Sequence, residues 1–201
     1  MKTLFFIVLI FLLAIAPFAV GQDKAKPDDN ANSGAPPKPL NDAMLTWMVG
    51  EWSGTTTSNM GTSDEWQKVD MSLDKQFVTI NLTSQLTKVD AQFLKAQAAQ
   101  MKMSEQDVDK MMKGSAYKGM GLMTLDPKTG GCIGYWFDNW RGMYTGTGKV
   151  EGNKITMNWN GTMGAEVRTI EKDDKGNMVE TFKQTMNGST IEGKTVRVRK
   201  K

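Results

Sequence analysis

Tight-turn pairs divide the second half of this chain into short segments of alternating polarity. Gly152-Asn153, Lys175-Gly176 and Asn187-Gly188 are combinations typical of two-residue hairpin turns. In residues 155–159, apolar Ile, Met and Trp alternate with polar Thr and Asn, which is the pattern of a strand with one buried face. Because such turns join adjacent antiparallel strands, the pattern favours a continuous antiparallel sheet.

About ten segments have strand character, a number typical of a small barrel or a sandwich. They lie at residues 51–58, 63–73, 76–86, 115–125, 131–138, 142–151, 154–160, 164–172, 177–186 and 190–199. Of the six prolines, only Pro127 lies beyond residue 39, so the sheet is almost free of the residue that interrupts strand pairing. We predict an all-β fold, a closed antiparallel up-and-down β-barrel, with a sandwich as the alternative.

The two ends of this region carry residues that can close a small barrel. Trp52 lies at the start of the first predicted strand, and Arg197 and Arg199 lie in the last. A guanidinium stacked on an indole face contributes about 1–2 kcal/mol when it is partly desolvated. We therefore predict that Trp52 and one of these arginines close the barrel, with a ligand contact as the alternative. Strand alternation places both arginines on one face, so the sequence leaves the partner open.

Two stretches are predicted to be helical. Asn41 can cap a short N-terminal helix over residues 42–48, which ends before Gly50. Residues 88–113 contain two capping-box-like starts and apolar residues at helical spacing, which predicts a helical insertion between the third and fourth strands. This methionine-bearing insertion lies either over a barrel opening or against a sheet edge or the outside of the wall.

The first 39 residues are predicted to lie outside the barrel. Lys2, the apolar run 4–20 and the small residues up to Gly21 are typical of a cleaved secretory signal peptide, residues 1–21, which predicts a secreted or periplasmic protein without stable membrane insertion. An uncleaved membrane anchor is the alternative. Residues 22–39 hold four prolines among small and polar residues and are predicted to be a disordered linker. The barrel domain then spans residues 40–201.

The composition excludes several classes of function. The absence of histidine excludes His-dependent catalytic triads, His-ligated zinc and His-ligated haem. The net charge of +3 is dispersed except at residues 197–201, so we expect no nucleic-acid partner. Cys132 adjoins an apolar run and is predicted to be a small buried hydrophobe, with a reactive thiol or an intermolecular disulfide as alternatives.

The acidic residues show no pair that is set apart for acid–base catalysis. Most of them are expected on solvated outer faces of strands, a set made up of Glu51, Asp64, Glu65, Asp70, Glu166, Glu171 and Glu180. We therefore predict no catalytic residue, no cofactor and no metal site. Binding of Cu(I) by the methionines is the alternative for a metal, because thioethers are soft ligands. The sequence makes no prediction of oligomeric state.

Aromatic side chains are concentrated around residues 135–144. Rings bury large apolar areas and line many small-molecule sites. The residues predicted to bind a ligand inside the barrel are Trp66, Tyr135, Phe137, Trp140, Tyr144, Met157 and Trp159. The alternative for each of them is plain core packing. Strand alternation points Tyr135 and Phe137 to one face and Trp136 to the other.

Three segments together resemble a known family. They are 47–54 (Trp-Met-Val-Gly-Glu-Trp-Ser-Gly), 117–126 (Tyr-Lys-Gly-Met-Gly-Leu-Met-Thr-Leu-Asp) and 135–139 (Tyr-Trp-Phe-Asp-Asn). In order and spacing they resemble the bacterial domain of unknown function 1579 family, which is similar to lipocalin-like barrels such as the calycins and nitrobindin-like proteins. The resemblance implies a barrel of about ten strands, a short helix plugging one end and an interior cavity. It implies no activity, and the haem-ligating histidine of nitrobindin-like proteins has no counterpart here.

These observations favour a protein that binds a small apolar or amphipathic ligand in the barrel interior. The alternative is a cell-envelope interaction or structural module, in which side chains fill the barrel and the methionine-bearing insertion binds a partner. An enzyme is not expected, because no convincing pair of nucleophile and base is present.

Overall fold

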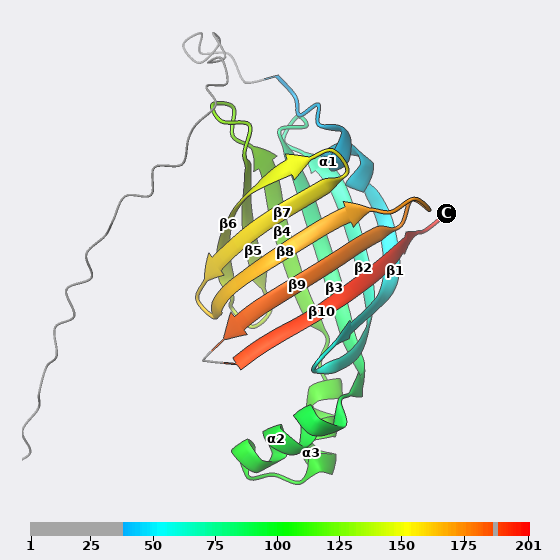
Figure 1. The fold of residues 1–201 in the computed structure, drawn as a ribbon, viewed down its shortest axis with the longest axis vertical. Helices are drawn as coiled ribbons and strands as arrows, with labels where there is room; N and C mark the ends of the chain where they lie inside the picture. Colours follow the sequence, from blue (N-terminus) through cyan, green and yellow to red (C-terminus); the bar gives the residue numbers. More distant parts are fainter. Residues whose placement is uncertain (1–37, 187–188) are drawn as a thin grey trace, which may run out of the picture.

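A computed structural model describes residues 38–186 and 189–201 of the chain. Ten strands join into one closed antiparallel barrel (Figure 1), which confirms the predicted fold class. The signal peptide, the linker up to residue 37 and the Asn187-Gly188 turn lie outside the described residues, and they stay predictions.

Each strand pairs with its neighbours in the sequence, and the last strand returns to pair with the first. The strands are β1 (Gly50–Ser58), β2 (Gly61–Ser72), β3 (Phe77–Val89), β4 (Tyr117–Leu125), β5 (Cys132–Asp138), β6 (Met143–Glu151), β7 (Lys154–Gly161), β8 (Gly164–Lys172), β9 (Met178–Met186) and β10 (Ser189–Arg199). The helices are α1 (Ala43–Met48), α2 (Ala91–Met101) and α3 (Glu105–Lys113).

Helix α1 plugs one end of the barrel, which we call the proximal end. Its N-cap is Asp42, not the predicted Asn41, because the Asp42 carboxylate accepts a hydrogen bond from the Leu45 amide at 2.8 Å. Met44, Leu45 and Met48 are all buried in the core. The opposite, distal end is formed by the strand ends that include Tyr117 and Asp138.

The predicted helical insertion is present as the hairpin α2–α3 between β3 and β4. Figure 1 shows it standing off the distal end of the barrel beside β3. Val108 of α3 is fully buried, and the Gln85 amide on β3 donates to the Lys113 carbonyl at 2.7 Å. The sequence left open whether the insertion covers a barrel opening or packs beside the wall. The structure shows it packed against the distal end of β3.

The seam between β1 and β10 closes the wall. Trp52 pairs in register with Arg199, and the Arg199 guanidinium carbon lies 4.1 Å from the centre of the Trp52 ring. The same guanidinium donates to the carbonyls of Trp47 and Val49, and the Trp52 indole donates to the Met48 carbonyl at 2.8 Å. The stack therefore ties the helical plug to both strands of the seam, and Arg199 is the arginine that makes it.

Glycines on β4, β5 and β6 make room for large inward side chains. A Cβ at Gly146 would lie 2.6 Å from the Trp159 ring, and one at Gly134 would lie 2.5 Å from it. Gly119 and Gly121 lie in the same way against Trp136, with distances of 2.1 and 2.6 Å. The indoles consequently lie flat against neighbouring backbone inside the barrel.

Replacing Gly146 with alanine should destabilise the barrel. The added methyl group meets a ring that is held in a packed core, so we expect a loss of about 1–3 kcal/mol in the free energy of unfolding. Urea unfolding followed by circular dichroism measures the change. Thr147→Val, at the next and outward-facing position of β6, is the matched control and should leave the unfolding midpoint nearly unchanged. An unaltered midpoint for the alanine variant would show that the ring moves freely.

Candidate functional site

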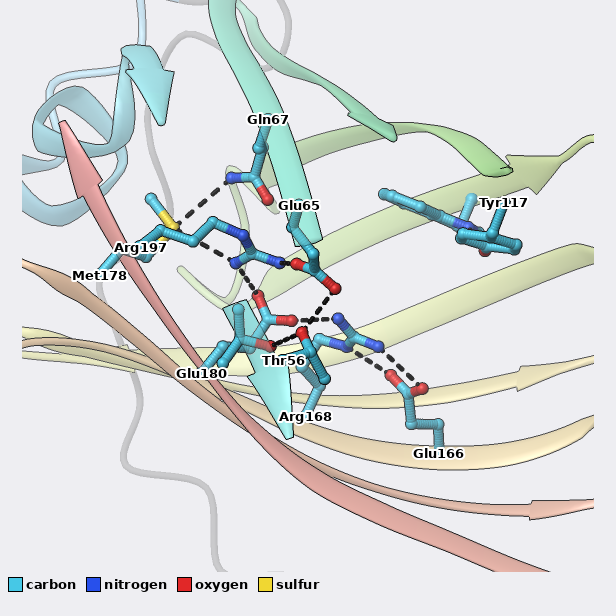
Figure 2. A network of polar contacts seen from close by, with 11 residues as sticks. Thr56, Glu65, Gln67, Tyr117, Glu166, Arg168, Met178, Glu180 and Arg197 are labelled. Carbon is cyan, nitrogen blue, oxygen red and sulfur yellow. Dashed lines mark hydrogen bonds and ion pairs between the residues drawn. The ribbon is translucent and has the colours of Figure 1, made fainter. Parts of the chain in front are cut away.

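A charged network crosses the barrel interior (Figure 2). Arg197 of β10 donates to Glu180 of β9 at 3.0 Å and to Glu65 of β2. Arg197 is 1% exposed and Glu180 is 3% exposed. Successive side chains of a strand point to opposite faces, and these side chains occupy positions on the inward face of the wall.

Arg168 of β8 extends the network toward the distal end. It makes a two-pronged contact with Glu166, with N···O distances of 2.5 and 3.0 Å, and it also donates to Glu180. Its guanidinium lies 5.2 Å from the centre of the Phe182 ring. The Arg168 side chain is 25% exposed, so solvent reaches this part of the inward-facing network.

Hydroxyl groups complete the network beside the seam. Thr56 donates to Glu65 at 2.6 Å and shares a second hydrogen bond of 2.6 Å with Thr195. Three carboxylates and two guanidinium groups leave this layer with one negative charge in excess. The Nε of Arg197 is a buried donor that has no hydrogen-bond partner among the residues that the structure describes.

Glu180 is held as a carboxylate by both arginines. Burial alone would raise its pKa, but the charges and hydrogen bonds of Arg168 and Arg197 outweigh burial and lower the pKa to about 2. The sequence predicted that most acidic residues lie on solvated outer faces of strands, and Glu65, Glu166 and Glu180 are exceptions that face inward. Glu180 lies on the inward face of β9 between Met178 and Phe182, whereas the inward neighbour of Glu65 on β2 is the buried Gln67.

Aromatic residues line the distal half above this network. The Trp136 indole donates to the Tyr117 hydroxyl at 2.7 Å, and the Tyr117 hydroxyl lies 3.4 Å from the Asp138 carboxylate. Burial raises the pKa of Tyr117 well above its usual value, so the hydroxyl stays protonated. Trp136, Tyr117, Tyr144 and Phe182 are each half-buried. The distal half therefore combines partly accessible aromatic rings with the charged network that borders it.

The predicted ligand-binding residues divide between the two faces of the wall. Tyr144, Met157 and Trp159 face inward, and Met157 and Trp159 are buried in the core. Their role in binding stays a prediction.

Four of the predicted residues lie elsewhere. Tyr135 and Phe137 face outward and are 44% and 41% exposed, and Trp140 lies in the β5–β6 turn and is 58% exposed. Trp66 alternates with inward Glu65 and Gln67 and is also on the outer face. The glycines opposite Trp136 explain the choice of face, because they leave room for that ring inside the barrel. Gly-x-Gly at 119–121 was the signal that sequence reasoning missed.

Cys132 is buried, as a small core residue would be. Burial raises its pKa to about 11, with a smaller contribution from Asp42, so the thiolate nucleophile is scarce at neutral pH. Within residues 38–186 and 189–201 there is no group of three acidic, cysteine or histidine side chains arranged to hold a metal ion. In the same ranges, no helix is long and apolar enough to span a bilayer.

Comparisons with known proteins show the fold. No protein-family model matches the chain, and no curated protein matches it in sequence. Among solved structures, the S-type phycobiliprotein lyase CPES from Guillardia theta is similar, with a TM-score of 0.52 and 9% sequence identity over 78% of this chain and 90% of that chain. At this identity the likeness shows that the chain folds as a lipocalin-like barrel.

The charged network predicts a stability that falls in acid. The folded pKa of Glu180 is about 2 and its ordinary value is 4.5, so its contribution of about 3 kcal/mol is complete above pH 4.5 and is lost as the pH falls toward 2. Urea unfolding midpoints measured from neutral pH down to that window should therefore drop steeply.

Glu180→Gln should unfold at lower urea at neutral pH and should lose much of this acid dependence. Glu192→Gln, which changes an exposed carboxylate on β10, should behave as the wild type does. Equal pH profiles for the wild type and Glu180→Gln would contradict the assigned role of this carboxylate.

Proposed function

We propose that this chain is a secreted or periplasmic binding protein that holds a small amphipathic molecule in the distal half of its barrel. The charged network across the interior carries the proposal. Buried ion pairs are often no more stabilising than apolar side chains of similar volume. A barrel that needed only to be filled would gain little from burying five charged groups, whereas a binding site gains fixed donors and acceptors.

Arg168 is the group that we assign to the ligand's polar head. A guanidinium has five N–H donors, and Arg168 uses three of them on Glu166 and Glu180. The remaining donors lie on a side chain that is partly open to solvent. Glu166, held in place by the same contact, offers acceptors beside them. A head group that both accepts and donates hydrogen bonds fits this pair.

The apolar body of the ligand would pack on the distal rings. Trp136 and Tyr144 pair in register, and the Phe182 ring lies against the Arg168 guanidinium. Rings that are half-buried in the free protein can gain further burial when a ligand covers them. The proximal half is already filled by apolar core residues and is assigned a structural role.

Binding without catalysis is part of the proposal. The chain has no histidine, its thiol is buried with a raised pKa, and the inward carboxylates are held by arginines. The activity named for the similar structure is that protein's own. Membership in the domain of unknown function 1579 family is likewise proposed from the three sequence segments alone.

Nile red, an amphipathic fluorescent dye, tests the proposal. Trp136→Leu and Arg168→Met should each weaken its binding about tenfold, since each removes one of the two groups assigned to body and head. Phe137→Leu, one position along β5 and on the outer face, is the control and should change the affinity little. If only Phe137→Leu lost Nile red binding, the dye would bind on the outer face of the wall, and the proposal would be wrong.

A second candidate is an envelope module that binds a partner through the insertion. Exposed methionines favour it, because Met101, Met103 and Met111 are 42%, 40% and 46% exposed on or beside α2 and α3. Replacing residues 91–113 with a short turn separates the two functions. The interior site should keep its Nile red affinity within about twofold, whereas an insertion-based site would lose it. A co-purifying small molecule in native mass spectra of the wild type would favour the interior site.

A further inference from the structure

An apolar patch lies on the outer face of the wall at the distal end. Met120, Phe137 and Met143 are register partners across β4, β5 and β6, and they are 45%, 41% and 55% exposed. Tyr135 lies on the same face, and Trp140 lies at the tip of the β5–β6 turn. We call these five residues the rim patch. Exposed apolar side chains gathered in this way are typical of a binding surface.

The surface beside the rim patch is concave. A hollow of about 350 Å³ adjoins it and is lined by residues of β3, β4 and β5. Its outward-facing residues are Asn81, Thr83, Lys118, Met120, Phe137 and Asn139. The hollow is thus apolar on one side and carries amides and an ammonium group on the other.

The exposed charged side chains of the strands and turn that form the rim patch have one sign at the distal end. Lys118 and Arg141 are exposed beside it. On the outward positions of β4, β5 and β6 the single carboxylate is Glu151, which lies at the proximal end and pairs with Lys149 at 2.6 Å. The nearby Asp138 faces inward and accepts hydrogen bonds from the amides of Trp140 and Gly142 at 2.9 and 2.8 Å. The outward positions of these three strands are therefore apolar and cationic toward the distal end, whereas the neighbouring helix α3 carries the exposed carboxylates of Glu105 and Asp107.

We propose that the rim patch docks on a lipid bilayer that contains anionic lipid. Tryptophan and tyrosine prefer the interface between headgroups and acyl chains. Lysine and arginine beside them are attracted to anionic headgroups. Trp140 at a turn tip can enter the interface while the strands behind it stay outside. Met120, Tyr135, Phe137 and Met143 lie on the outer face of the wall, away from the interior site, and Trp140 contacts Tyr117 of the distal half with 5.4 Å between ring centres.

Vesicle binding of the full chain tests the proposal. We expect it to bind vesicles of phosphatidylcholine with phosphatidylglycerol more tightly than vesicles of phosphatidylcholine alone. Lipids with brominated chains should quench the fluorescence of Trp140. Residues 1–37 contain no tryptophan, so this signal reports on the barrel and not on the apolar leader. The quenching should vanish in Trp140→Phe, whose remaining indoles lie elsewhere.

Two sets of variants separate the apolar and the electrostatic contributions. Phe137→Ser with Trp140→Ser should lower the vesicle partition coefficient at least tenfold. Lys118→Gln with Arg141→Asn should remove the preference for the anionic lipid; asparagine suits the left-handed backbone of residue 141 (φ 65°). Val196→Ser with Val198→Ser is the matched control, since these β10 residues are 40% and 52% exposed outside the patch.

The proposal is overturned if brominated lipid leaves Trp140 unquenched, or if both variant sets partition as the control does. A concentration-dependent dimer or a complex of fixed stoichiometry that the same substitutions abolish, without vesicle binding, would instead assign the patch to a protein partner. Circular dichroism and urea unfolding of each variant show whether a loss of binding reflects loss of the fold.

Discussion

The pairing of β1 with β10 is the constraint on which the rest of the structure depends. Once the wall is closed, none of the ten strands within residues 38–186 and 189–201 has a free edge, and each of their side chains faces either the inside or the outside. Arg199 fixes this closure by covering Trp52 and by holding two carbonyls around the helical plug. A register slip of one residue at the seam would exchange the two faces of a strand and place charges where apolar groups now lie.

The closed interior is divided along the barrel axis. Apolar residues from α1 and from the proximal halves of the strands fill one half. Arginines and carboxylates then cross the barrel, and half-buried rings follow toward the distal end. Removing one partner from such a network costs about 3–5 kcal/mol because a charge is left uncompensated. The network therefore tolerates the loss of a single member poorly, and it gives the interior a polar and an apolar side.

Much of this fold could be predicted from the sequence. Hairpin turns, the scarcity of proline and period-two alternation are local signals, and they were sufficient for ten antiparallel strands, while capping boxes and helical spacing predicted the place of the insertion. The Trp–Arg stack could be expected because its members lie in the first and last strands. The choice between Arg197 and Arg199 could not, because it depends on register across the seam.

The site was harder to predict, for a physical reason. Alternation groups residues into faces without saying which face is inside, and the dense rings of β5 lie on both. Tyr135 and Phe137 were assigned to the interior, while the space beside Gly119 and Gly121 admits Trp136. The inward carboxylates were missed because each of them needs an arginine from another strand, and such pairing leaves no trace in the spacing of residues along one strand.

The position of the α2–α3 hairpin bears on how this barrel can vary between lineages. The hairpin is inserted between two adjacent wall strands and packs beside the end of β3, so its sequence is uncoupled from the register of the ten-strand circuit. Insertions and deletions accumulate where they leave strand pairing intact. Related proteins can therefore carry different insertions at this position while they keep the same ten-strand barrel.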